Sequence, residues 1–162
     1  MQAQNGALAF ALEGWQNYQE QLRAAVASLT ADQLALRPAP HLRTVGELVL
    51  HIIDTRAGWG ARVLRLGGPE FAAYEDWQVP ETSSNPVADL VQALDDTWKV
   101  LADAVRQFTL ESLDETLQAE DRGKTYTFKR GWVLWHLVEH DLHHGGELSW
   151  SLGMNSLKAI DI

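Results

Sequence analysis

The chain has 162 residues, of which 46% are apolar and 22% charged, as expected of a soluble globular protein with a single domain over residues 1–162. Its net charge of −9 argues against nucleic-acid binding, which depends on Lys and Arg to neutralise phosphates. Because the chain has no cysteine, disulfides and thiolate metal sites are excluded, and any metal would need imidazole, carboxylate or water ligands.

The N-terminal segment MQAQNGALAFALEGWQ has neither a basic region nor a long apolar run, so it does not resemble a signal peptide. No apolar run in the chain approaches the ~20 residues that span a membrane. We therefore expect a cytoplasmic protein that binds neither a membrane nor nucleic acid.

Four long segments have apolar residues at helical spacing, and no stretch alternates convincingly between apolar and polar residues as a strand would. The predicted helices span about 5–28, 44–67, 85–105 and 130–152. The second begins with a capping box formed by Thr44 and Glu47, and the third with Asn85 and Pro86, an N-cap followed by proline at the first helical position. Gly153 is expected to end the fourth helix.

The connections between these helices include two long ones. Residues 67–85 lack a helical pattern, and a loop of this length is usually functional or mobile, so Tyr74 and Trp77 either form a lid or pack back onto the helices. Residues 109–129 contain a short capped turn at 112–115. Together these elements predict an all-α protein, an antiparallel four-helix bundle with a long crossover connection.

Five of the six histidines lie on two predicted helices. His136, His140 and His144 repeat every four residues, which places their rings along one helical face at about 100° per residue. This row borders the apolar stripe, as does His51, whereas His143 is placed toward water. Three imidazoles from two helices with an open fourth position match a catalytic zinc-type site, and nickel, iron or copper also accept nitrogen ligands. The alternative is a set of hydrogen-bonded core histidines.

Two segments, LRTVGELVLHIIDTRAGW and RGWVLWHLVEHDLHHGGEL, resemble the DinB-like superfamily of damage-inducible bacterial proteins and their thiol-transferase relatives. That superfamily pairs a histidine in its second helix with H-x-x-x-H in its fourth, and the resemblance extends over nearly the whole chain. It implies an up-down-down-up four-helix bundle and a divalent metal, commonly nickel or zinc, with iron or manganese as further candidates. By position, the implied ligands are His51, His140 and His144, with His136 and His143 beside them.

Other side chains near the histidines have two interpretations each. Where relatives often have Arg-Gly-Gln after the double histidine, this chain has Gly-Gly-Glu, and Glu147 either hydrogen-bonds a ligand imidazole or is solvated at the helix end. Arg56 and Trp59 are placed at the pocket mouth; Arg56 would hold a substrate carboxylate there, although a surface ion pair is its favoured role. Asp141 falls on the apolar face and needs a partner, either a buried arginine or another chain.

The resemblance implies a metal-dependent transferase that adds a low-molecular-weight, bacillithiol-like thiol to an electrophile in detoxification or stress response. The metal would lower the pKa of that thiol, and a chain without cysteine suits this chemistry because the cosubstrate supplies the sulfur. Two alternatives stay open: a non-catalytic dimeric bundle that binds a divalent metal or a small ligand, and a relative of the mycothiol-type maleylpyruvate isomerases. The helix pairing usual in the superfamily predicts a homodimer.

Overall fold

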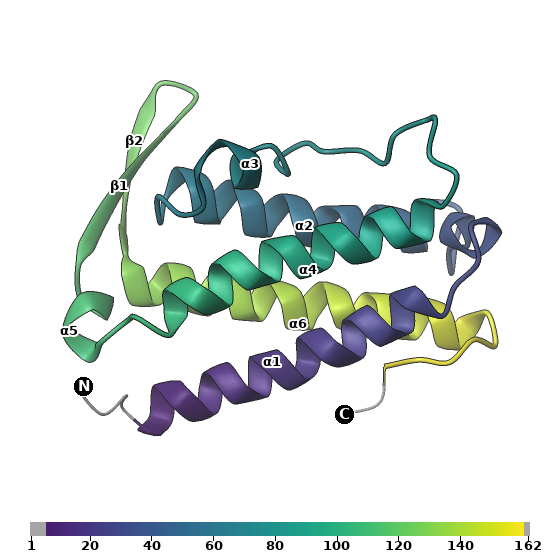
Figure 1. Ribbon diagram of the computed structural model, residues 1–162, viewed down its shortest axis with the longest axis horizontal. Helices are drawn as coiled ribbons and strands as arrows, with labels where there is room; N and C mark the ends of the chain where they lie inside the picture. Colours follow the sequence, from purple (N-terminus) through teal and green to yellow (C-terminus); the bar gives the residue numbers. More distant parts are fainter. Residues whose placement is uncertain (1–5, 161–162) are drawn as a thin grey trace.

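The computed structural model describes residues 6–160, apart from the side chain at position 121. Within this range four long helices lie side by side (Figure 1). They are α1 (Gly6–Ala27), α2 (Val45–Arg62), α4 (Pro86–Val105) and α6 (Arg130–Met154). Helix α2 packs against α4 and α6, and α1 packs against the other side of the same two helices. Helices α2 and α4 run in the same direction, because the connection between them returns along the length of the molecule (Figure 1).

The expected starts of α2 and α4 are confirmed. The Thr44 hydroxyl accepts a hydrogen bond from the Glu47 backbone N–H, and the Glu47 carboxylate accepts one from the Thr44 N–H at 2.6 Å. The Asn85 side chain accepts from the Ala88 N–H, and Pro86 is the first residue of α4. These side chains satisfy N–H groups that the first turn of a helix otherwise leaves unpaired.

A β-hairpin leads into α6, so the expectation of no strand is wrong for this segment of a mostly helical chain. Strands β1 (Thr116–Asp121) and β2 (Lys124–Lys129) pair antiparallel along their full length. Their turn has Arg122 and Gly123 at φ values of 48° and 74°, the left-handed pair that a tight two-residue hairpin requires. Each strand is mostly exposed and carries few apolar residues. The alternation of apolar and polar residues along it is therefore too short to detect in the sequence.

The short helices lie in the connections. They are the 3-10 helix η1 (Asp32–Ala35) and the α-helices α3 (Gly68–Ala72) and α5 (Leu110–Leu113). Helix α3 occupies part of the segment in which no helix is predicted. Helix α5 is capped by Thr109 and Ser112, so the turn predicted at 112–115 begins three residues earlier than expected.

Two long helices end at different residues than predicted. Helix α2 ends at Arg62 rather than near Gly67, because Arg65 adopts a left-handed φ of 60° and the Leu66 N–H turns back to the Gly60 carbonyl at 3.0 Å. Helix α6 continues through Gly153 to Met154. No helix among residues 6–160 is both long and apolar enough to cross a membrane.

The apolar core consists of two clusters along the helices. Leu22 and Ile52 belong to the cluster near the η1 end, and Leu101 and Leu137 to the cluster near the hairpin end. Between them lies a layer of buried polar side chains. Such a layer is stable only if every charge and polar group in it has a partner.

The polar layer is built around an ion pair between Arg56 of α2 and Asp141 of α6, which are 0% and 1% exposed. The Arg56 Nη2 donates to the Asp141 carboxylate at 2.7 Å and to Gln19 Oε1 at 2.8 Å, and its Nη1 donates to the Leu94 carbonyl at 3.3 Å. The indole N–H of Trp15 donates to the same carboxylate at 2.7 Å. The prediction that Arg56 lines a pocket mouth or forms a surface ion pair is therefore wrong, and Arg56 is the partner that Asp141 requires.

We predict that Asp141→Ala lowers the free energy of unfolding by about 3–5 kcal/mol, because it leaves the Arg56 guanidinium buried without its counter-charge. Urea denaturation followed by circular dichroism measures this loss. The matched control is Asp95→Ala, which breaks the half-exposed pair between Asp95 and Arg23 and should cost less than about 1 kcal/mol. Equal losses in the two variants would contradict the central role of the buried pair.

Candidate metal centre

Three histidines from two helices converge between α2 and α6. The ring centroid of His51 lies 4.7 Å from that of His140 and 4.5 Å from that of His144, and the last two are 4.3 Å apart. One nitrogen from each ring lies within 4.8 Å of the others. His51 and His140 are partly buried and His144 is 9% exposed, so the cluster sits at the edge of the core. Nitrogen atoms at this spacing can bind one divalent cation.

Local helix geometry explains this convergence. His140 and His144 are four residues apart on α6, so their side chains lie one above the other on the face that packs against α2. On the same helix Leu137 and Leu148 are buried at 1% and 0% exposure and fix the rotation of that face. His51 faces His140 and His144 from α2, and the next residue of α2, Ile52, is buried in the core.

The environment keeps two of the three imidazoles neutral. Burial, followed by the nearby charges of Arg43 and His144, lowers the pKa of His51. Burial, reinforced by His144 and His51, lowers the pKa of His140 to about 3. A neutral imidazole has a free lone pair, which is the form that binds a metal.

Glu147 orients His144, the least exposed of the three histidines. Its Oε2 lies 2.7 Å from the Nδ1 of His144, and the carboxylate is about half exposed. A carboxylate only accepts hydrogen bonds at neutral pH, so His144 carries its proton on Nδ1 and leaves Nε2 free as a ligand. Of the two interpretations open to Glu147, the structure therefore supports contact with a histidine of the cluster.

The protein's own hydrogen bonds leave His140 incompletely satisfied. Its Nε2 lies 3.1 Å from the His51 Nε2 and 3.0 Å from the Thr55 hydroxyl, whereas its buried Nδ1 has no partner among the described residues. A buried ring nitrogen without a partner is costly. The neutral imidazoles of His51 and His140, whose Nε2 atoms face each other, and the oriented His144 together fit a divalent cation coordinated by nitrogen.

His136 and His143 lie outside the cluster. The ring of His136 stacks on Trp132 with an interplanar angle of 6° and packs edge-on against Trp59 at 4.7 Å. It is 6.1 Å from the His140 ring, so it continues the histidine row as part of an aromatic stack. The side chain of His143 is 64% exposed and lies 3.5 Å from the Glu147 carboxylate. Trp59 therefore contacts the hairpin side of the row, away from the opening beside His51.

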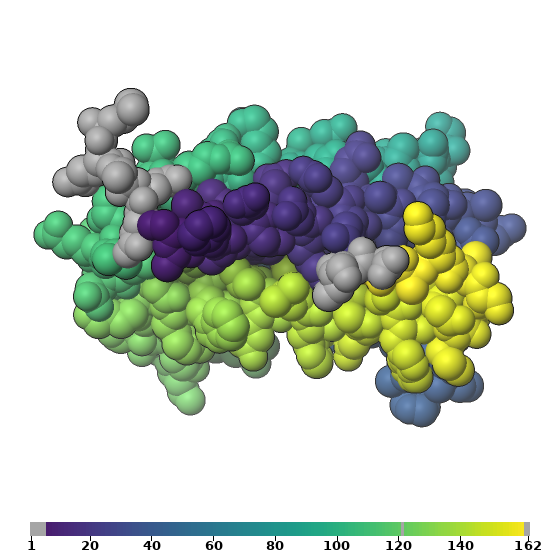
Figure 2. All heavy atoms as spheres, turned by 90° about the horizontal axis from the view of Figure 1, so that it is seen from below, coloured from purple at the N-terminus to yellow at the C-terminus, as the bar shows by residue number. Residues whose placement is uncertain are grey.

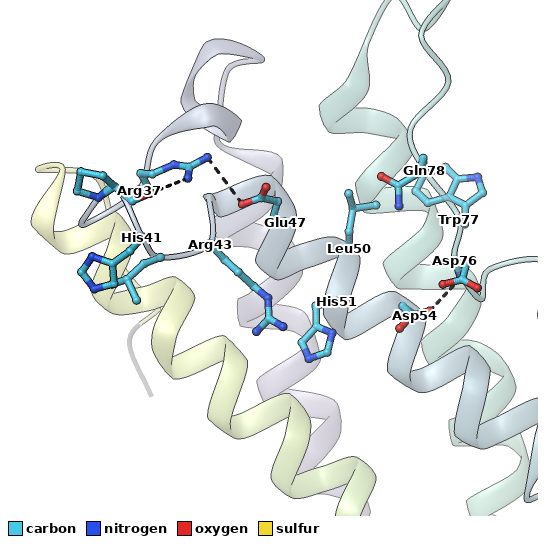
Figure 3. Close-up of a pocket in the computed structure, with 12 residues that line it drawn as sticks. Arg37, His41, Arg43, Glu47, Leu50, His51, Asp54, Asp76, Trp77 and Gln78 are labelled. Atoms are coloured by element: carbon cyan, nitrogen blue, oxygen red, sulfur yellow. Dashed lines mark hydrogen bonds and ion pairs between the residues drawn. The ribbon is translucent and has the colours of Figure 1, made fainter. Parts of the chain in front are cut away.

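A cavity of about 530 Å³ opens beside the histidine cluster (Figure 3). His51 and Asp54 line it from α2, and Trp77 lines it from the connection between α3 and α4. Within that connection Trp77 also packs on the core, and the Tyr74 hydroxyl donates to Asp96 of α4 at 2.6 Å. The segment 67–85 is therefore held against the helices and at the same time forms one wall of the cavity.

Three residues near the cluster are absent from the sequence prediction. Thr55 and Asp54 follow His51 by four and three residues, so helical spacing alone places them on the same face and would have identified them. Arg43 lies in the loop before α2, where no periodicity indicates which way a side chain points.

Comparisons with known proteins identify the family and the fold. A family model described as the DinB superfamily matches residues 15–148. The structure is similar to a DinB-like protein from Bacillus cereus ATCC 10987, with a TM-score of 0.70, 19% sequence identity and coverage of 94% of this chain and 95% of that one. It is also similar to a DinB-like protein from Bacillus subtilis, with a TM-score of 0.62, 17% identity and coverage of 94% and 96%. No curated protein matches the sequence.

We predict that Glu147→Gln weakens zinc binding by about 10–100-fold, because a neutral amide holds the His144 imidazole less firmly than a carboxylate does. Competition with a chromophoric chelator measures the affinity, and His140→Ala provides the reference for a lost site. The matched control is Glu139→Gln, since Glu139 is exposed and lies 4.0 Å from His136, outside the cluster. If Glu147→Gln binds zinc as tightly as Glu139→Gln, the carboxylate has no role in holding the metal.

Proposed function

The chain belongs to the DinB superfamily, and from this membership and its histidine cluster we propose that it is a metal-dependent transferase that adds a low-molecular-weight thiol to an electrophile. The observation that carries the proposal is the meeting of His51, His140 and His144, of which His51 also lines an open cavity. A purely structural cluster would have no need of such an opening. The absence of cysteine supports a thiol that comes from a cosubstrate.

A divalent metal held by the three histidines would supply a Lewis acid that lowers the pKa of a bound thiol. His51 and His140 present neutral nitrogens, and Glu147 holds the third imidazole in the ligating tautomer. In the reaction a sulfur–carbon bond forms, the bond from that carbon to the leaving group breaks with its electron pair, and the thiol proton passes to solvent. The cavity beside His51 provides the space for the two small molecules.

The nitrogen ligands favour zinc or nickel, and iron or manganese are weaker candidates because they prefer sites that include oxygen ligands. We further propose that the chain works in the cytoplasm, where small thiols are kept reduced. The helix directions in Figure 1 support the up-down-down-up arrangement of an antiparallel four-helix bundle with one long crossover between α2 and α4.

A non-catalytic dimeric metal-binding bundle is the second candidate, and the surface of α6 favours the dimer. Large apolar side chains that are 44–60% exposed recur on one face of this helix, at Trp132, Trp135, Leu142 and Trp150. Gly146 lies on the same face with no atom near the position of a Cβ, so another helix can approach closely there. Figure 2 shows α1 and α6 side by side across one side of the molecule, where a partner has access to α6.

Removal of the metal is the direct test of the transferase. Zinc- or nickel-loaded protein should conjugate a small thiol such as 2-mercaptoethanol to 1-chloro-2,4-dinitrobenzene, and dialysis against a chelator should abolish turnover until metal is restored. His51→Ala should behave like the chelated protein because it removes one ligand. Turnover that persists without metal would refute the mechanism, whereas tight metal binding without any turnover would favour the non-catalytic candidate.

The dimer is tested by multi-angle light scattering. We expect the mass of a dimer for the unmodified chain and the mass of a monomer for Trp135→Glu combined with Leu142→Glu, because two charges would have to be buried in the interface. Phe10→Glu changes a large apolar side chain on α1 that is 74% exposed, and it serves as the control. A monomeric unmodified chain at high concentration would rule out the proposal.

A further inference from the structure

Arg43 stands at the mouth of the histidine cluster. It lies in the loop between η1 and α2 and lines two neighbouring cavities, of about 530 and 290 Å³. His51 lines the first of these cavities, and Glu147, which orients His144, lines the second. One side chain therefore borders the cluster from both the α2 side and the α6 side.

The guanidinium of Arg43 points toward the imidazole of His51 in Figure 3. The guanidinium forms neither a hydrogen bond nor an ion pair with any residue that the structure describes, and its side chain is exposed. A planar group with five donors beside a metal site is thus available to a ligand.

The neighbouring Arg37 differs in this respect. Its Nη1 donates to the Pro40 carbonyl at 3.2 Å, and its Nη2 lies 3.9 Å from the Glu47 carboxylate. Figure 3 shows these contacts directing Arg37 away from His51. Although both arginines line the same cavity, only Arg43 is directed at the cluster.

Two acidic side chains of the cavity, Asp54 and Asp76, lie beyond His51 on the side away from Arg43, whereas Glu47 lies on the arginine side and contacts Arg37. Asp54 accepts a hydrogen bond from the backbone N–H of Asp76 at 2.8 Å, and Asp76 is held in a left-handed conformation with φ of 56°. These two carboxylates repel an anion from that end of the cavity. An anionic ligand that reaches the histidine cluster is therefore drawn to the Arg43 end.

We propose that Arg43 recognises a carboxylate on the small molecule that reacts at the histidine cluster. This role for Arg43 rests on the proposed transferase function and names the residue that determines its substrate specificity. A guanidinium binds a carboxylate through two parallel hydrogen bonds, which fixes the orientation of the ligand as well as its position. The carboxylate belongs either to the thiol or to the electrophile, and matched pairs of substrates distinguish these two sources.

The thiol is tested by binding to cobalt-loaded protein, followed through the sulfur-to-cobalt charge-transfer absorption. The probes are 3-mercaptopropionate and its methyl ester, which share the thiol end and differ in the charge of the other end. We expect the unmodified protein to prefer the acid by about fivefold, the gain typical of a solvent-accessible ion pair. Arg43→Gln should lose this preference, and Arg37→Gln, which removes the same charge from the same cavity, should retain it.

The electrophile is tested by the kcat/KM values of 4-chloro-3-nitrobenzoate and its methyl ester with 2-mercaptoethanol as the thiol. Each value is divided by the rate constant of the same reaction without enzyme, because the ester group activates the ring more than the carboxylate does. Here too Arg43→Gln should abolish a preference for the acid that Arg37→Gln keeps, and Arg43→Lys should restore part of it. A preference in either pair that depends on Arg43 supports the proposal and identifies the source of the carboxylate.

Two negative results have different meanings. If the esters bind and react as well as the acids, or if Arg37→Gln abolishes the preference as fully as Arg43→Gln does, Arg43 is not the recognition residue and the transferase proposal stands. If neither thiol perturbs the cobalt spectrum and no substrate turns over, the transferase proposal fails, and the role of Arg43 fails with it.

Discussion

The buried ion pair between Arg56 and Asp141 is the constraint on which the arrangement of α2 and α6 depends. Two charges removed from water at 0% and 1% exposure are tolerable only in one geometry, in which each finds its partners. A slide of α6 along α2 by a single turn would separate them and leave both unpaired. The pair therefore selects one register of the two helices. The apolar contacts above and below it cannot do so, because apolar side chains can exchange one apolar neighbour for another.

That register is what brings the histidines together. Thr55 and His140 are the immediate sequence neighbours of Arg56 and Asp141, and their side chains meet at 3.0 Å. His51 and His144 lie one turn further on each helix, in the same direction away from the ion pair. The polar layer thus holds the cluster from one side, and neither helix can shift to relieve an unsatisfied imidazole. A rigid support of this kind suits a metal site, whose ligands must stay within a few tenths of an ångström of their positions.

How far the sequence predicted this structure depends on whether a feature is local. Thr44 with Glu47, and Asn85 with Pro86, define helix starts within a few residues, and the four-residue spacing of His140 and His144 defines a face. A helical wheel gives a side chain its face but not its neighbour on another helix. The wheel therefore does not identify Arg56 as the partner that Asp141 needs. The hairpin escaped detection because its strands are short, and its mostly exposed surface requires little apolar alternation.

The division between helices and loops has a functional consequence. The three clustered histidines lie on α2 and α6, whereas Arg43 and Trp77 reach the cavity from the connections before and after α2. Connections tolerate substitution better than packed helices do, because fewer contacts restrain them. Two DinB-like structures share this fold at only 17–19% identity, so the helical frame persists while most side chains change. In such a frame the proposed chemistry of the metal and the proposed choice of substrate would be separable, because the residue proposed for that choice lies in a loop that borders the cavity.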